Sequence, residues 1–189
     1  MELEKIEEYI RERLSEKRYY HSLCVMERSE EIAKMYNNTE IENVKKIGLA
    51  HDVAKEMTDV EKIKYVKEND IEIDEIERQN TGLLHAKIGA DISKKVFGFT
   101  NEMAEAIENH TTGNINMNMY SKILFIADRT SKERKLDNKE EIEKLLDEDI
   151  DKAILFILDE KIKLQIKKGQ LIHIRGVLAR NEFLTKTSK

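Results

Sequence analysis

The chain has 189 residues, with no proline, seven glycines and a formal net charge of −5. The length allows one domain, residues 1–189, and the scarcity of proline and glycine predicts an all-α fold with short turns. The negative charge argues against a protein that binds duplex nucleic acid, and a single cysteine, Cys24, excludes an internal disulfide. Because the chain shows no secretory signal and no long apolar stretch, we expect a cytoplasmic protein that does not cross a membrane.

Apolar residues recur at helical spacing through most of the chain, with charged residues of both signs between them. Asn38 and Thr39 are expected to cap the third helix, segment 71–80 to form a short surface helix, and residues 185–189 to be disordered. The pattern predicts helices at 2–14, 16–35, 40–51, 60–67, 82–96, 101–109, 119–127, 137–146, 150–166 and 171–183.

A neighbouring pair, His51 and Asp52, stands at the end of the apolar helix predicted over 40–51. Aspartate is a poor helix former and a costly group to bury, so its position there requires a partner. A divalent cation would serve, provided that further nitrogen and oxygen ligands converge on the pair. The candidates lie inside or at the end of apolar helical patterns: His21, His85, His110 and Asp128.

Each candidate also has an ordinary structural explanation, such as a histidine bonded to a backbone carbonyl. The metal site is favoured because four of the five histidines share this placement, and because an unpartnered Asp128 after the apolar run 119–127 would be expensive. Thr111 and Thr112 after His110 can donate hydrogen bonds to anionic oxygens, although they also suit a plain helix end. Arg134 suits either substrate phosphate or a solvated basic turn.

The order His21, His51-Asp52, Asp128 resembles that of the HD hydrolase superfamily, which comprises helical metal-dependent phosphohydrolases. His85 and His110 resemble the additional ligands of its two-metal members. Within the superfamily, five stretches are similar to the YqeK-like family in order and spacing: residues 18–21, 49–55, 84–90, 106–113 and 122–128. The resemblance covers most of a motif core at about 16–135, and residues 137–184 follow it as C-terminal helices.

The resemblance implies a symmetrical diadenosine tetraphosphate hydrolase that forms two ADP with two divalent metal ions. Iron is implied by the family, and manganese or zinc would accept the same donors. One metal is expected on His21, His51, Asp52 and Asp128, and the second on Asp52, His85 and His110. Catalytic roles are expected for Asp52, Lys55 and His85. Contacts with substrate phosphate are expected for Lys87, Thr111, Thr112 and Arg134.

The segment after Asp128 departs from the family pattern. Arg134 is the one residue of that pattern that this chain retains there. Two other functions therefore stay open. One is a phosphatase or phosphodiesterase that acts on another nucleotide with the same metal centre, and the other is a nucleotide-sensing module of low turnover. The nucleotide is the only partner that the sequence indicates, and a homodimer is compatible with it.

Overall fold

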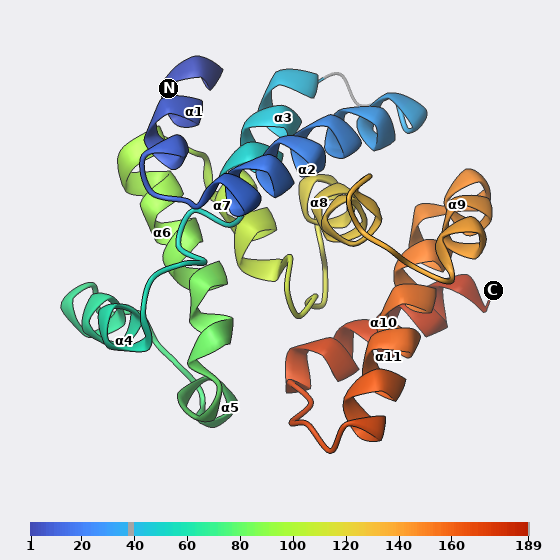
Figure 1. The fold of residues 1–189 in the computed structure, drawn as a ribbon. Helices are drawn as coiled ribbons and strands as arrows, with labels where there is room; N and C mark the ends of the chain where they lie inside the picture. Colours follow the sequence, from blue (N-terminus) through green and yellow to red (C-terminus); the bar gives the residue numbers. More distant parts are fainter. Residues whose placement is uncertain (38–39, 189) are drawn as a thin grey trace.

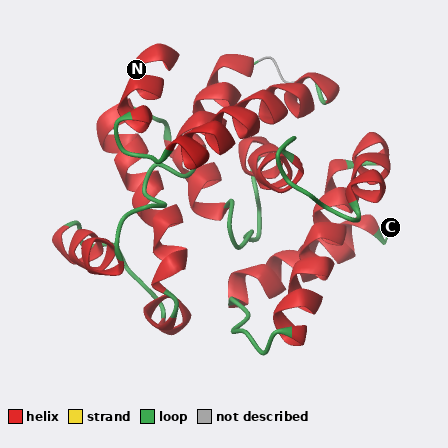
Figure 2. Ribbon diagram, viewed as in Figure 1, coloured by secondary structure: helices red, strands yellow, loops and turns green. Residues whose placement is uncertain are grey.

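The computed structural model describes residues 1–37 and 40–188. These residues form eleven α-helices and one 3₁₀ helix and contain no β-strand (Figure 2), which confirms the all-α prediction. The helices are α1 (Leu3–Arg11), α2 (Glu16–Met35), α3 (Ile41–Ala50), α4 (Asp59–Glu68), α5 (Glu75–Gln79), η1 (Thr81–Leu83), α6 (Leu84–Phe97), α7 (Asn101–Asn109), α8 (Met119–Thr130), α9 (Lys139–Glu148), α10 (Ile150–Lys167) and α11 (Ile174–Thr187).

The predicted elements differ from the structure mainly at the C-terminus. The expected disorder after 184 is wrong up to Thr187, because α11 continues there; Phe183 is fully buried and Lys186 pairs with Glu182. The predicted surface helix in 71–80 forms as α5, but Glu77 within it is buried. The expected cap at 38–39 and the last residue, 189, lie outside the described residues.

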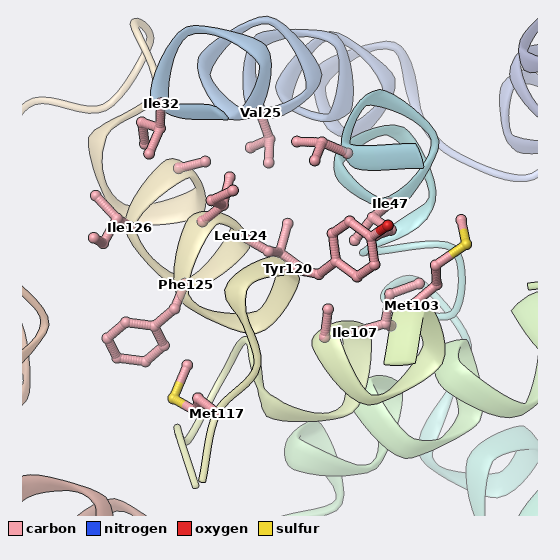
Figure 3. Packing of buried hydrophobic residues seen from close by; sticks show 14 of the residues in the cluster. Val25, Ile32, Ile47, Met103, Ile107, Met117, Tyr120, Leu124, Phe125 and Ile126 are labelled. Carbon is pink, nitrogen blue, oxygen red and sulfur yellow. The ribbon is translucent and has the colours of Figure 1, made fainter. Parts of the chain in front are cut away.

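Helix α8 lies at the centre of the molecule and organises the main core (Figure 1). It packs against α2, α3, α7 and α10. Figure 3 shows Val25 and Ile32 of α2 directed toward α8, Leu124 and Tyr120 next to each other on α8, and Ile47 of α3 beside Tyr120. These side chains are at most 7% exposed, so the apolar run of α8 is the structural reason that Asp128, in its last turn, is held firmly in place.

Hydroxyl and amide side chains cap the starts of α2, α4, α7 and α8. In each case an oxygen of the capping side chain accepts a hydrogen bond from the backbone N–H three residues later, which satisfies one of the free donors at a helix start. The caps are Ser15 for α2, Thr58 for α4, Thr100 for α7 and Asn118 for α8. The starting points of α2, α7 and α8 set the rotational positions of His21, His110 and Asp128.

Gly48 allows α2 and α3 to approach closely. A Cβ atom at this position would lie 2.9 Å from the Cα of Met26 and 3.0 Å from the Oγ of Ser29. Only glycine fits without separating the two helices. The close approach brings the ring centroid of His51, just after α3, to 5.1 Å from that of His21 on α2.

Two groups of helices flank the central ones. Helices α4 and α5 lie to one side of α6, where Val66, Leu84 and Ile88 form a second, smaller apolar cluster. Helices α10 and α11 form a pair on the other side (Figure 1), packed against α8 and α9. Among the described residues, none of the helices is both long and apolar enough to span a bilayer.

Candidate metal centre

Five helices bring four imidazoles and two carboxylates together. The rings of His21, His51, His110 and His85 follow one another with centroid separations of 5.1, 5.2 and 5.0 Å. All six side chains are buried except that of Asp128, which is partly exposed. They are His21 from α2, His51 and Asp52 after α3, His85 from α6, His110 after α7 and Asp128 from α8. We call this set the His/Asp cluster.

Three of the imidazoles are oriented by the backbone of their own helices. The Nδ1 atoms of His51, His85 and His110 donate hydrogen bonds to the carbonyl oxygens three residues earlier, at 2.8, 2.5 and 2.6 Å. Each Nε2 atom is thereby directed into the cluster. The Nε2 atoms of His85 and His110 lie 3.1 Å apart. In two neutral rings arranged in this way, the lone pairs of the two Nε2 atoms would face and repel each other. A cation bound between the two atoms removes this repulsion.

Asp52 lies among these nitrogens. Its Oδ1 atom is 3.4 Å from Nε2 of His85 and 3.6 Å from Nε2 of His110, and its Oδ2 atom is 3.4 Å from Nε2 of His51. Burial alone raises the pKa of Asp52, but the surrounding imidazoles outweigh burial and hold the pKa well below its ordinary value. The side chain is therefore a carboxylate, with oxygens facing two groups of imidazoles.

Asp128 completes the other end of the cluster. Its Oδ1 atom is 3.0 Å from Nε2 of His21 and 3.9 Å from Nε2 of His51. Burial raises the pKa of Asp128, yet the hydrogen bond from His21 and the charges of His51, His110 and Arg134 hold it far below the ordinary range. Asp128 is thus also an anionic oxygen donor.

The cluster fits divalent metal ions. Ligand atoms of His21, His51 and Asp128 lie within 4.8 Å of one another, and so do those of His51, Asp52 and His110. Nε2 of His51 and Oδ1 of Asp52 are buried without a hydrogen-bond partner, although buried polar atoms normally have one. Imidazole nitrogen together with carboxylate oxygen is a donor set that iron, manganese and zinc accept. The unsatisfied atoms are explained if they are metal ligands.

Glu133 is a residue of the site that the sequence interpretation missed. Its carboxylate is 2.5 Å from Nδ1 of His21 and accepts a hydrogen bond of 2.7 Å from the hydroxyl of Ser131. A carboxylate on the outer nitrogen of a metal-binding histidine fixes the ring and raises its basicity. The sequence contained a signal for this residue, since Glu133 stands five residues after Asp128. It was missed because the segment was interpreted as a basic turn.

A cavity of about 300 Å³ opens beside the cluster, and we call it the α10 cavity. One part of its lining is cationic and adjoins His110 and Asp128. The other part is apolar, formed by Phe125, Ile157 and Leu164, and carries the amides of Gln165 and Gln170. The cationic residues are Lys55, Arg129, Arg134 and Lys161. A cavity with positive charge near a metal site and an apolar wall further away suits a nucleotide.

Several sequence-predicted contact residues reach the cluster. The Nζ atom of Lys55 is 3.1 Å from Nε2 of His85, and burial lowers the pKa of Lys55 despite the opposing effect of Asp52. The hydroxyl of Thr111 lies 3.2 Å from Nε2 of His85 and 3.1 Å from Nε2 of His110. The Nη2 atom of Arg134 donates to Oδ1 of Asp128 at 2.7 Å.

Lys87 is not brought to the His/Asp cluster. Its ammonium group lies 2.7 Å from a carboxylate oxygen of Glu77 and 2.7 Å from the carbonyl oxygen of Glu72, away from the cluster. Residues two positions apart on a helix point about 200° apart, so Lys87 faces away when His85 faces the metal site. Its charge neutralises the buried Glu77.

Thr112 is also not brought to the cluster. Its hydroxyl donates to the carbonyl oxygen of Gly113 at 3.0 Å. Gly113 has a φ of +71°, which turns the chain after Thr112, and a Cβ atom on Gly176 of α11 would lie 3.1 Å from the carbonyl oxygen of Thr112. Of the two threonines, Thr111 is the one whose hydroxyl contacts the histidines.

Two cations of the site were also missed from the sequence. Arg18 donates to Oδ2 of Asp52 at 2.8 Å, and Lys161 of α10 donates to the carbonyl oxygen of Thr111. Arg18 lies one helical turn before His21, a spacing that could have indicated a shared face. Lys161 is 50 residues from Thr111 along the chain, and no local pattern indicates that contact.

Comparisons with known proteins agree with this geometry. Residues 18–133 match the HD domain model, and the chain therefore belongs to the HD domain family. A crystal structure described as a predicted HD superfamily hydrolase involved in NAD metabolism, from Clostridium acetobutylicum, is similar with a TM-score of 0.93 and 36% identity, covering 98% of both chains. The family predicted from the motifs is thus confirmed, and with it the class of hydrolase.

Three curated relatives are similar to most of this chain. A protein of Halalkalibacterium halodurans is 29% identical over 93% of both chains, and one of Bacillus subtilis is 25% identical over 85% of this chain and 86% of its own. A third, from Staphylococcus aureus, is 28% identical over 94% of this chain and 92% of its own. Each of these three proteins is named a symmetrical bis(5'-nucleosyl)-tetraphosphatase.

Proposed function

We propose that the protein hydrolyses diadenosine tetraphosphate symmetrically, into two molecules of ADP, with two divalent metal ions. The observation that carries the proposal is the His/Asp cluster beside a cavity that combines cations with an apolar wall. The names of the three relatives support the choice of substrate. Iron is the metal proposed from the family resemblance, and the donors also suit manganese and zinc.

The ligands divide into two groups that share Asp52. His21, His51, Asp52 and Asp128 are proposed for one metal, and Asp52, His85 and His110 for the other. The proximity of Asp52 to three imidazoles supports its role as the residue common to both. When bound, two divalent ions supply a water-derived nucleophile at neutral pH and stabilise charge on phosphate oxygens.

The chain's own cations complete the proposed chemistry. Lys55 and Arg134 stand at the edge of the cluster, where they neutralise negative charge that develops on the phosphate. The hydroxyl of Thr111 can donate to a phosphate oxygen from the same edge. Arg18 holds Asp52 in position from the opposite direction. The catalytic residues proposed are Asp52, Lys55 and His85.

The test is product analysis with protein purified without oxygen and supplied with ferrous or manganous ion. Diadenosine tetraphosphate should give ADP as the only nucleotide product. Formation of ATP and AMP would contradict symmetrical cleavage. Faster turnover of a mononucleotide or cyclic dinucleotide in the same panel would favour a phosphatase or phosphodiesterase. Tight ADP binding with slow turnover of every nucleotide would favour a sensing module.

Lys161 gives a pH-dependent test of the α10 cavity. Burial lowers the pKa of Lys161 to about 8, with Arg129 and Lys55 contributing in the same direction and Asp128 opposing. Its charge is present below pH 8 and lost above it. We expect Lys161→Met to reduce kcat/KM on diadenosine tetraphosphate about tenfold at pH 7, as for a lost charged hydrogen bond. The difference from wild type should vanish above pH 9.

The control for this variant is Lys163→Met, two residues along α10, because the Lys163 side chain is 72% exposed and pairs with Glu160 on the same helix. It should leave kcat/KM unchanged at every pH. Lys161→Arg retains the charge and should keep activity above pH 8. An equal loss in Lys161→Met at pH 7 and pH 9.5 would show that the ammonium charge of Lys161 does not act on the substrate.

We also propose that residues 1–189 act as one domain, because the α10 cavity is lined both by the motif core at about 16–135 and by the C-terminal helices, which supply Ile157, Lys161, Leu164 and Gln165 from α10. The C-terminal helices at 137–184 would then form part of the substrate site. The cytoplasmic location and the homodimer stay predictions from the sequence.

A further inference from the structure

A second cavity also adjoins the His/Asp cluster, through His21. It has a volume of about 670 Å³ and is lined by α2 and by the segment after α8. We call it the α2 cavity. His21 of the cluster lines it, whereas Asp128 and His110 line the α10 cavity. Because His21 and Asp128 are only 3.0 Å apart, the two cavities adjoin the same metal site.

Arg134 connects the two cavities, since it lines both. Its guanidinium group donates to Oδ1 of Asp128 at 2.7 Å and lies 3.4 Å from Nε2 of His21. A chain of phosphates that crosses the cluster would pass this cation on the way from one cavity to the other. Arg134 is therefore placed to contact the middle of a polyphosphate rather than one of its ends.

The α2 cavity contains groups that recognise a nucleotide. Tyr20 lines it with a side chain that is 51% exposed, an unusual degree of exposure for an aromatic ring next to a buried histidine. Lys17 and Lys135 also line it and have no ion-pair partner among residues 1–37 and 40–188. An exposed aromatic ring beside free cations is the combination by which proteins stack a base and hold its phosphates.

The two acids of the α2 cavity are held by contacts within the protein. Glu56 accepts hydrogen bonds from the backbone N–H and the hydroxyl of Ser15, at 2.6 and 2.7 Å. Glu133 is bound to Nδ1 of His21 at 2.5 Å and to Ser131. Both carboxylates are engaged within the protein, so the groups left for a ligand are cationic and aromatic.

We propose that the α2 cavity binds the second nucleoside of a dinucleoside polyphosphate, with its base stacked on Tyr20, while the α10 cavity binds the first. The inference rests on the proposed function. Symmetrical cleavage breaks a P–O bond at the central bridging oxygen, and the substrate has an equal half on either side of that oxygen. Two cavities that adjoin the cluster and meet at Arg134 can each accept one half.

The experiment compares two substrates, diadenosine tetraphosphate and adenosine 5'-tetraphosphate, which has the same phosphates but one nucleoside. In Tyr20→Ala we expect KM for diadenosine tetraphosphate to rise about tenfold, the usual effect of losing one base–aromatic stack. KM for adenosine 5'-tetraphosphate, kcat and the metal content per chain should stay as in wild type. Tyr20→Phe, which keeps the ring, should behave as wild type.

Tyr20→Leu provides a second variant without a ring, with a good helix former in α2, and should raise the same KM as Tyr20→Ala. An unchanged KM for diadenosine tetraphosphate in both variants would overturn the inference and leave the proposed function intact. An equal rise for both substrates would also overturn it, since that result indicates a disturbed metal site. Failure of the wild-type protein to cleave diadenosine tetraphosphate would overturn the proposed function and this inference together.

Discussion

Replacing Asp52 by alanine should lower kcat/KM on diadenosine tetraphosphate by about 10⁴-fold, since removing one member of a catalytic unit has effects of this size. Asp52 is 2% exposed and lies within 3.6 Å of three imidazoles. Without its carboxylate, the imidazoles lose the oxygen donor that lies between them, and the positive charge of Arg18 loses its partner next to the metal positions. Metal analysis should therefore show the loss of both metal ions, and circular dichroism should show an unchanged helix content.

The matched control is Asp147→Ala, which removes an exposed aspartate of α9 far from the cluster in sequence and should leave both metal content and turnover unchanged. Asp52→Asn separates charge from shape, and it should lose nearly as much activity as the alanine variant. A fully active Asp52→Ala protein would eliminate Asp52 as the shared ligand. Loss of helix content in that variant would instead indicate that the carboxylate mainly holds the fold through Arg18.

The helices were predictable because their information is local. The apolar period and the capping residues are both read within a few positions, and α2 begins at Glu16 and ends at Met35 as expected. The same applies to the ends of α3 and α7, where His51 and His110 occupy the C-cap positions. Backbone carbonyls three residues earlier then orient both rings, so helix position alone directs their Nε2 atoms inward.

Contacts that depend on tertiary packing were not predictable in the same way. Glu133 reaches His21 across 112 positions, and Lys161 reaches Thr111 across 50. Neither contact follows from periodicity, because the relevant elements meet only after α8 and α10 have packed. Lys87 is different. Its separation of two positions from His85 already places it on another face of α6, so its distance from the cluster follows from local helix geometry.

Separate replacement of His85 and His110 by alanine should test whether the cluster holds two metals. Their Nε2 atoms are 3.1 Å apart and each lies within 3.6 Å of Oδ1 of Asp52, whereas His21 is 3.0 Å from Asp128. Loss of either ring should therefore reduce metal content from two ions per chain to about one. Turnover should fall about a thousandfold, because the remaining ion cannot stabilise both oxygens of the displacement.

His21→Ala provides the complementary variant, since it should remove the ion at the opposite end and leave the pair formed by His85 and His110. If the two positions are separate, the His85 and His21 variants should each retain one ion, and the double variant should retain none. Two ions per chain in both the His85 and the His110 variants would contradict the two-metal assignment. One ion in the wild-type protein would reduce the site to a single centre, and Asp52 would then be a ligand of that ion alone.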